Sequence, residues 1–308
     1  MIGFRYHLVS LVAVFLALAV GLVLGTTQLS GSVLDDVRGQ VSTLSADKRA
    51  LQAQVRTLRG QVRTADTVTA ALAPKIVAGQ LKGRRVVLLA GPQADGAVTD
   101  GVQKILGQAG ATVTGRVQLT DDWTDPRRAA DLKSFVTGDS QPAGFQLPET
   151  DDAGVLGGAL LSYVLLTPAS GAGADAASVS QVLAGFTSLA MLRVESQQVA
   201  PADYAVVVTS HAARGGAERA RVLGQLAGAL DKAGRGAVVA GTAAAAGEDG
   251  LVGVVRGDAG LATAVSTVDD ADTGSGLVST VLALTQQADG KSGQYGVAGN
   301  ADAPLPPT

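Results

Sequence analysis

The chain contains no cysteine, and this absence removes several classes of function at once. Disulfide bridges, thiolate metal centres and thiol nucleophiles all require cysteine sulfur. Histidine and methionine are also scarce: the histidines are His7 and His211, and Met191 is the only methionine after Met1. No Met-rich or His-rich motif is therefore present.

Strong charge of either sign is also missing, since the formal net charge is −3 and no run of Lys or Arg forms a stripe. Nucleic-acid binding depends on such positive patches, so no nucleic-acid partner is expected. Aromatic residues make up only 3% of the chain, yet 46% of the 308 residues are hydrophobic. This composition supports a buried core and excludes a disordered chain.

The longest apolar run is Leu8–Gly25, LVSLVAVFLALAVGLVLG, in which Ser10 is the only polar side chain. As a helix this run is about 27 Å long, close to the roughly 30 Å hydrocarbon core of a bilayer. A cleaved signal peptide and a buried core helix are the alternatives. A signal peptide usually has its small-residue cleavage site after the apolar run, whereas the matching Ala17–Ala19 lies inside it. We therefore predict an uncleaved transmembrane anchor over residues 8–25.

Charges on the two sides of this segment predict its orientation. Arg5 and His7 precede the segment, and Asp35 and Asp36 follow it. Positive residues concentrate on the cytoplasmic side of membrane helices. We therefore expect residues 1–7 in the cytoplasm and the main domain outside, in a protein of the cell membrane or cell envelope.

Apolar residues then recur in alternating steps of three and four, which predicts a coiled-coil stalk over residues 33–73. The predicted dimer seam consists of Leu34, Val37, Val41, Leu44, Lys48, Leu51, Val55, Leu58 and Val62. Val at position a with Leu at position d favours a parallel two-stranded coil, and a polar Lys48 at a selects the register at a cost in stability. The pattern predicts a parallel homodimer or larger homo-oligomer; one long helix packed on its own domain is the alternative.

Residues 84–290 are predicted to form an extracytoplasmic α/β domain. Short apolar runs suited to buried parallel strands are Arg84–Gly91, Tyr204–Thr209, Ala237–Gly241 and Thr263–Val268, with Ala111–Leu119 as a strand nearer an edge. Helix-like stretches lie between them: Asp95–Gln108, Asp125–Val136, Asp151–Leu166, Ala176–Leu192, Ala217–Ala233 and Gly276–Ala288. Such alternation predicts a doubly wound, mostly parallel α/β sandwich.

Three further features complete the predicted organisation. Pro74, with Gly79 and Gly83 close behind, predicts the end of the stalk helix. Residues 125–200 are more helical than their surroundings and are interpreted as a helical insertion. The Gly/Pro-rich tail 291–308 is expected to be extended.

Two polar groups follow predicted strands, where α/β folds often place their sites. Ser210 and His211 end one strand, and a group of aspartates follows another: Asp269, Asp270 and Asp272. His211 and the three aspartates are weak candidates for metal ligands, but a helix N-terminal cap explains the aspartates more simply. No G-x-S-x-G elbow accompanies Ser210, so we predict no catalytic residue and no cofactor.

A glycine pattern also matches the fingerprint of a dinucleotide-binding site. Gly171, Gly173 and Ala176 fit G-x-G-x-x-A, and Glu195 follows at about the expected distance. Pro168, however, separates the glycines from a preceding run that reads as helix, and 40 glycines produce such matches by chance. We do not interpret the pattern as a binding site.

Both ends of the chain resemble the actinobacterial copper transporter (MctB-like) family. The matching residues at the start are Arg5, His7, Val9 to Leu11, Ala13 to Gly21, and Leu24 to Gly25. Near the end they are STVDDADTGSGLVSTVLAL and then Gly293-Gln294-Tyr295-Gly296. The resemblance runs through the stalk as well and is weakest over residues 120–200.

This resemblance implies a cell-envelope protein of copper homeostasis, a channel or transport component that keeps intracellular copper low. Copper is then the transported species, because the chain offers no Cys, Met cluster or clustered His to bind it firmly. One transmembrane helix cannot line a pore alone, so transport would require an oligomer or another envelope protein. The residues by themselves favour an alternative, a non-catalytic envelope scaffold whose α/β domain binds a protein or cell-wall partner. An exported enzyme is the third hypothesis.

Overall fold

The computed structural model describes residues 3–138, 141–168, 171 and 173–307, with no side chains described at 4 and 26–36. Residues 1–2 of the predicted cytoplasmic tail and Leu34 of the predicted seam therefore lie outside the described residues or side chains, as does the last residue of the tail. The chain divides into two units, Met1–Thr64 and Ala65–Thr308.

The first unit consists of most of one long helix, α1, which spans Gly3–Val77. Its stretch Arg5–Gly25 has a mean hydropathy of 2.8 and no buried residue, and is long and apolar enough to cross a membrane. The predicted anchor and the predicted stalk are continuous in this helix. The apolar seam residues whose side chains are described are 43% to 69% exposed in the single chain: Val37, Val41, Leu44, Leu51, Val55, Leu58 and Val62.

The end of α1 differs from the prediction drawn from Pro74. The helix includes Pro74 and ends at Val77, three residues later. A proline in a helix removes one backbone hydrogen bond and is costly. Ala73 and Val77 on either side are 2% and 0% exposed, so their burial in the core of the second unit offsets this cost.

The second unit is built on a seven-stranded sheet with the order β3-β2-β1-β4-β5-β6-β7. The strands are β1 Arg85–Ala90, β2 Thr112–Leu119, β3 Leu192–Val194, β4 Tyr204–Val208, β5 Ala237–Ala240, β6 Ser266–Val268 and β7 Gln294–Tyr295. Every neighbouring pair is parallel except β2 with β3, which is antiparallel. The predicted mostly parallel sheet is confirmed.

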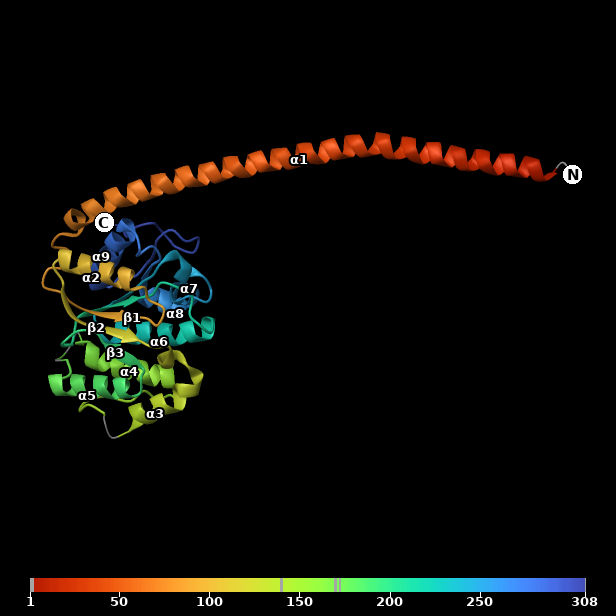
Figure 1. The fold of residues 1–308 in the computed structure, drawn as a ribbon. Helices are drawn as coiled ribbons and strands as arrows, with labels where there is room; N and C mark the ends of the chain where they lie inside the picture. The colour runs from red at the N-terminus through yellow and green to blue at the C-terminus, as the bar shows by residue number, and fades with distance from the viewer. Residues whose placement is uncertain (1–2, 139–140, 169–170, 172, 308) are drawn as a thin grey trace. The chain divides into compact units, whose positions relative to one another are not determined.

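Helices cover both faces of this sheet (Figure 1). They are α2 Gly96–Gln108, α3 Ala129–Thr137, α4 Ala153–Leu165, α5 Ala176–Ser188, α6 Ala217–Ala233, α7 Leu251–Gly257, α8 Ala259–Ala264 and α9 Gly274–Ala288. Short 3₁₀ turns are η1 Asp121–Thr124, η2 Pro126–Arg128 and η3 Ala243–Ala246. Side chains of α2, α9 and the end of α1 pack on one face, and those of α4 to α7 on the other.

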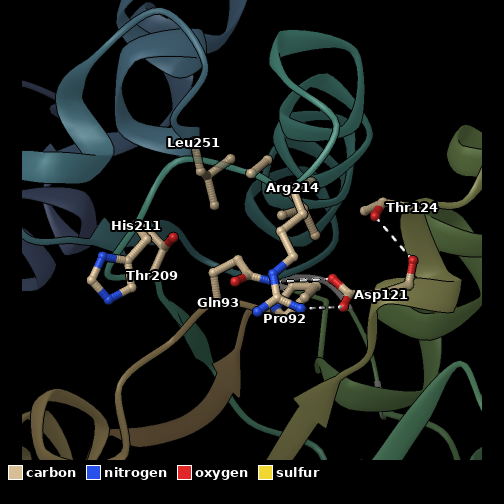
Figure 2. A pocket seen from close by; sticks show the side chains of 10 residues that line it. Pro92, Gln93, Asp121, Thr124, Thr209, His211, Arg214 and Leu251 are labelled. Atoms are coloured by element: carbon tan, nitrogen blue, oxygen red, sulfur yellow. Dashed lines mark hydrogen bonds and ion pairs between the residues drawn. The ribbon is translucent and has the colours of Figure 1, made fainter.

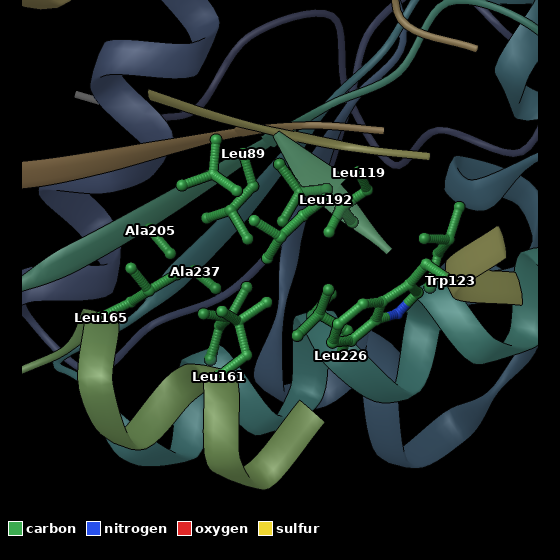
Figure 3. Packing of buried hydrophobic residues seen from close by; sticks show 14 of the residues in the cluster. Leu89, Leu119, Trp123, Leu161, Leu165, Leu192, Ala205, Leu226 and Ala237 are labelled. Atoms are coloured by element: carbon green, nitrogen blue, oxygen red, sulfur yellow. The ribbon is translucent and has the colours of Figure 1, made fainter. Parts of the chain in front are cut away.

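The alternation of side chains along the strands explains why both faces are buried. In β1, Val87 and Leu89 face the core beneath α4 and α6, whereas Val86 and Leu88 face the core beneath α2 and α9. Successive residues of a strand point to opposite faces, so a strand that is apolar throughout requires cover on both sides. Figure 3 shows Leu89 in the first of these cores, with leucines of α4 and α6 packed beneath the sheet.

Several short elements differ from the predictions. The predicted strand Thr263–Val268 begins only at Ser266, because Ala259–Ala264 form α8. The edge strand β3 was not predicted, and Leu192 was placed at the end of a helix that stops at Ser188. The tail, predicted to be extended, contributes the strand β7 to the sheet, a pairing that was not predicted. These elements are two to six residues long, too short to show a period.

Candidate functional site

A crevice lies where the chain reverses its direction across the sheet. From β1 the chain passes to β2 on one side and later to β4 on the other, so the loops after β1 and β4 diverge at the carboxyl edge. Ligands of open α/β sheets bind at such a switch point. Residues that follow β1, β2 and β4 line the crevice, among them Gln93, Asp121, Thr209, His211 and Arg214 (Figure 2).

The crevice is narrow. The space between its atoms, including open solvent at its mouth, is about 310 Å³. The centre of a water molecule can occupy only about 10 Å³ of this space. Asp121 lies at its side, where Oδ1 accepts a hydrogen bond from Gln93 Nε2 at 3.0 Å and Oδ2 lies 3.8 Å from Arg214 Nη1. The Arg214 side chain is 76% exposed. These polar groups already satisfy one another, so the crevice offers little unused binding capacity.

His211 lines this crevice and is exposed. No hydrogen bond joins Ser210 to His211 in the structure; Ser210 Oγ accepts one from Asp95 N–H at 2.8 Å. Ser210 instead ties the loop after β4 to the start of α2.

Asp269 has a structural role at the carboxyl end of β6. Its Oδ2 lies 2.7 Å from Arg256 Nη1, and the two side chains are 0% and 3% exposed. Its Oδ1 accepts hydrogen bonds from the backbone N–H groups of Val297 at 2.7 Å and Ala298 at 3.2 Å. A Cβ at Gly296 would lie 2.3 Å from the same carboxylate, so only glycine fits there. The carboxylate is fully occupied by protein groups.

Asp270 is also buried, at 3% exposure. Its Oδ2 accepts hydrogen bonds from Ser275 Oγ at 2.9 Å and Thr273 Oγ1 at 3.1 Å, while Oδ1 has no partner among the described residues. Burial raises the pKa of the Asp270 carboxyl above its usual value. Asp272, by contrast, is exposed.

The start of α9 is capped from two sides. Thr273 is its N-cap residue and accepts a hydrogen bond from Gly276 N–H. Asp66, near the end of α1, accepts one from Gly274 N–H at 2.6 Å. The capping function expected of Asp269, Asp270 and Asp272 is therefore performed by other residues.

The structure does not bring together the weak candidates for metal ligands. His211 follows β4 and the aspartates follow β6, with β5 between these strands. Within the described part of the chain, no group of three or more His, Asp or Glu side chains is placed to hold a metal ion.

Sequence reasoning missed Arg256, the partner of Asp269. A signal existed, because Arg256 is the only charged residue in the α7 sequence LVGVVRG. A lone charge on a short apolar helix indicates a buried partner of opposite sign. The sequence does not reveal which carboxylate supplies it.

The chain matches known proteins over almost its whole length. The family model described as "Copper transport outer membrane protein, MctB" matches residues 1–306. The chain belongs to this family. It is 35% identical over 302 residues to the copper transporter MctB of Mycobacterium tuberculosis (strain ATCC 25618 / H37Rv) and of Mycobacterium bovis, with 96% of each chain covered. It is 35% identical over 306 residues to the copper transporter MctB of Mycobacterium leprae, again with 96% of each chain covered.

Membership of the MctB family confirms the resemblance seen at the two ends of the chain. It also covers the middle of the chain, where that resemblance was weakest. Together with the apolar helix Arg5–Gly25, it indicates a protein of a membrane or the cell envelope. The relatives are named as copper transporters and not as enzymes.

Proposed function

We propose that this protein is a membrane-anchored component of copper transport in the cell envelope and helps to keep intracellular copper low. The observation that carries the proposal is the extent of the family match, which includes the apolar helix, the stalk and the α/β domain. Relatives named as copper transporters match 96% of this chain and not only one part of it.

The proposed role does not depend on a tight copper site in this chain. Cysteine is absent, and the described side chains include no cluster suited to a metal ion. Copper prefers thiolate, thioether or imidazole ligands, which are almost missing here. We infer that copper is the transported species and that an assembly of several chains, or another envelope protein, provides the route.

The stalk supports an assembly of at least two chains. Its apolar seam, from Val37 to Val62, is exposed in the single chain. Burial of a Val or Leu side chain contributes roughly 1.5–3 kcal/mol when complete, so seven half-exposed side chains represent a substantial driving force. A second copy of the same helix in parallel register matches Val with Val and Leu with Leu, as two-stranded coils require.

A scaffold that binds an envelope partner through its α/β domain is the second candidate. A scaffold requires no metal-ligand cluster, and the described residues include none. Copper content distinguishes the two candidates: deletion of a scaffold without a transport role leaves copper content unchanged, whereas deletion of a transport component raises it.

The test of the first proposal is a deletion strain grown with added copper. We expect more copper per cell by elemental mass spectrometry and a lower copper tolerance than in the parent strain. Zinc content serves as the control and should not change. Unchanged copper content together with unchanged tolerance would contradict the proposal.

A further inference from the structure

The last part of α1 has two apolar faces, and its own domain covers only one of them. Ala73 and Val77 are buried in the core of the second unit, at 2% and 0% exposure. Leu72 and Ile76, the residues directly before them, are 47% and 48% exposed. Residues four apart are neighbours on a helix surface, so Leu72 and Ile76 form an apolar stripe that is uncovered in the single chain.

This stripe continues the heptad of the stalk in phase. Leu72 lies two heptads after Leu58, a d position, and Ile76 lies two heptads after Val62, an a position. The helix is unbroken from Gly3 to Val77, so no turn or loop separates the stalk from the stripe. A parallel two-stranded coil favours Leu at d and β-branched Ile at a. The phase of the pattern therefore indicates that the same stripe of a second copy covers Leu72 and Ile76.

The residues between these positions are compatible with a second helix. Thr69 lies at the intervening a position, and its hydroxyl donates a hydrogen bond to the Ala65 carbonyl at 3.0 Å. The hydroxyl is therefore satisfied within its own helix and needs no partner across the seam. Pro74 lies at f, on the side of the helix opposite the a and d positions, so its ring does not enter the contact.

The face of α1 that packs on its own domain does not compete with this second helix. Ala73 lies at e and Val77 at b, and this pair is centred about 100° around the helix from the a and d positions. Asp66, also at e, accepts a hydrogen bond from Gly274 N–H at 2.6 Å, so the start of α9 lies on that side too. The end of α1 can therefore pack on its own domain and on a second copy at the same time.

Val68 indicates that this contact includes the domain and not only the helix. It lies at g, where two-stranded coils often carry Glu or Lys, and it is 54% exposed. The g residues of one helix lie beside the e residues of the other, and the e residue here is Ala73, which its own domain covers. Val68 of a second copy therefore lies where the domain of the first copy meets its helix. An apolar side chain suits that position.

We propose that the parallel coil continues through Ile76 and holds the two α/β domains of a dimer against each other where the stalk joins them. The inference rests on the stalk dimer proposed above and goes beyond it. A coil that ends at Val62 leaves the two domains tethered but independent, whereas a coil that continues through Ile76 makes the last turns of α1 a contact between domains.

Single cysteines in the full chain test this proposal in isolated membranes under mild oxidation. Leu72→Cys and Ile76→Cys should form disulfide-linked dimers to about the same extent as Leu44→Cys in the stalk, because facing a and d residues are close neighbours in a parallel coil. Ala71→Cys is the matched control. It lies next to Leu72 at the exposed c position and should stay largely monomeric.

The outcomes separate this proposal from the stalk dimer on which it rests. Cross-linking of Leu44→Cys without that of Leu72→Cys and Ile76→Cys would overturn the proposal and leave the stalk dimer intact. No cross-linking at any of the three positions would contradict the stalk dimer as well. Equal cross-linking of Ala71→Cys and Leu72→Cys would show chance encounters and would also overturn the proposal.

A measurement without cysteine provides a second test. Leu72→Ser with Ile76→Ser should raise the dissociation constant of the full-chain dimer in detergent at least about tenfold, because two apolar side chains per chain no longer gain from burial. Analytical ultracentrifugation measures this constant. Ala71→Ser with Ala78→Ser, both at exposed c positions, is the matched control and should leave the constant unchanged. Equal dissociation constants for the two double variants would overturn the proposal.

Discussion

Arg256 and Asp269 form an ion pair that is closed off from solvent and that fastens the C-terminal segment to the sheet. Besides Asp269, the Arg256 guanidinium donates to Thr267 Oγ1 at 2.8 Å and to the Tyr295 carbonyl at 2.7 Å. Asp269 in turn accepts from Val297 N–H. One charge pair therefore joins α7, β6 and the segment after β7, and its loss leaves the remaining charge buried.

Asp269→Asn should consequently be strongly destabilising. Removal of one partner of a buried pair costs about 3–5 kcal/mol, because the other charge remains without a counter-ion. Denaturant unfolding of the full chain in detergent measures this loss. Asp151→Asn is the control, because the Asp151–Lys133 pair is 97% and 41% exposed and should contribute little to stability. Equal losses in the two variants would show that the buried pair does not fasten the segment.

The close contact between the end of α1 and the start of α9 leads to a second prediction. A Cβ at Gly274 would lie 2.5 Å from the backbone nitrogen of Ala70, so Gly274→Ala must push the two helices apart. We expect a loss of about 1–3 kcal/mol and faster hydrogen exchange near Asp66. Gly107→Ala in α2 is the matched control, because nothing lies within 4 Å of its Cβ position and alanine favours helix. A neutral Gly274→Ala would mean that this close approach does not exist.

Asp270 gives the domain a predictable dependence on pH. Burial raises its pKa in the folded state, so the folded chain keeps a proton that the unfolded chain has released above about pH 4. Stability therefore falls as pH rises from the unfolded pKa to the raised folded pKa.

Asp270→Asn should remove this fall. As pH rises from about 4 to about 8, the free energy of unfolding of the variant should increase relative to that of the parent chain. Urea titrations of both chains at these two pH values measure the difference. Asp272→Asn, at an exposed position, is the control and should follow the parent. Parallel profiles for Asp270→Asn and the parent would contradict the assignment.

How far the sequence predicts this fold depends on the length of each element. The apolar runs that became β1, β4 and β5 are four to six residues long and buried on both faces, and the sequence located all three. α6 was predicted at its observed bounds, Ala217–Ala233. β3 and β7 have three and two residues and exist only because a neighbouring strand pairs with them, so no local pattern predicts them.

The sites were less predictable because they depend on residues that are distant in the chain. The sequence indicated Asp269 as a possible metal ligand. Its partner Arg256 and the backbone N–H groups that donate hydrogen bonds to its carboxylate become apparent only in three dimensions.

Cysteine cross-linking tests the predicted parallel coil. Because the chain contains no cysteine, no other cysteine of the chain competes with a single introduced one. Leu44→Cys lies at a d position of the seam, where facing residues of a parallel dimer are neighbours, and should cross-link in isolated membranes under mild oxidation. Ala46→Cys lies two residues further, on the outer face, and should not. Cross-linking of Ala46→Cys alone would exclude the proposed register.

The central claim is that the chain lowers intracellular copper as an assembly held by its stalk. The most direct measurement is the copper content of a deletion strain that expresses either the parent chain, the seam variant Leu51→Ser with Leu58→Ser, or the outer-face control Ala46→Ser with Ala53→Ser, at equal membrane levels. We predict high copper without the chain, low copper with the parent and the control, and high copper with the seam variant. Equal copper content in the deletion strain and in the strain that expresses the parent chain would contradict the account.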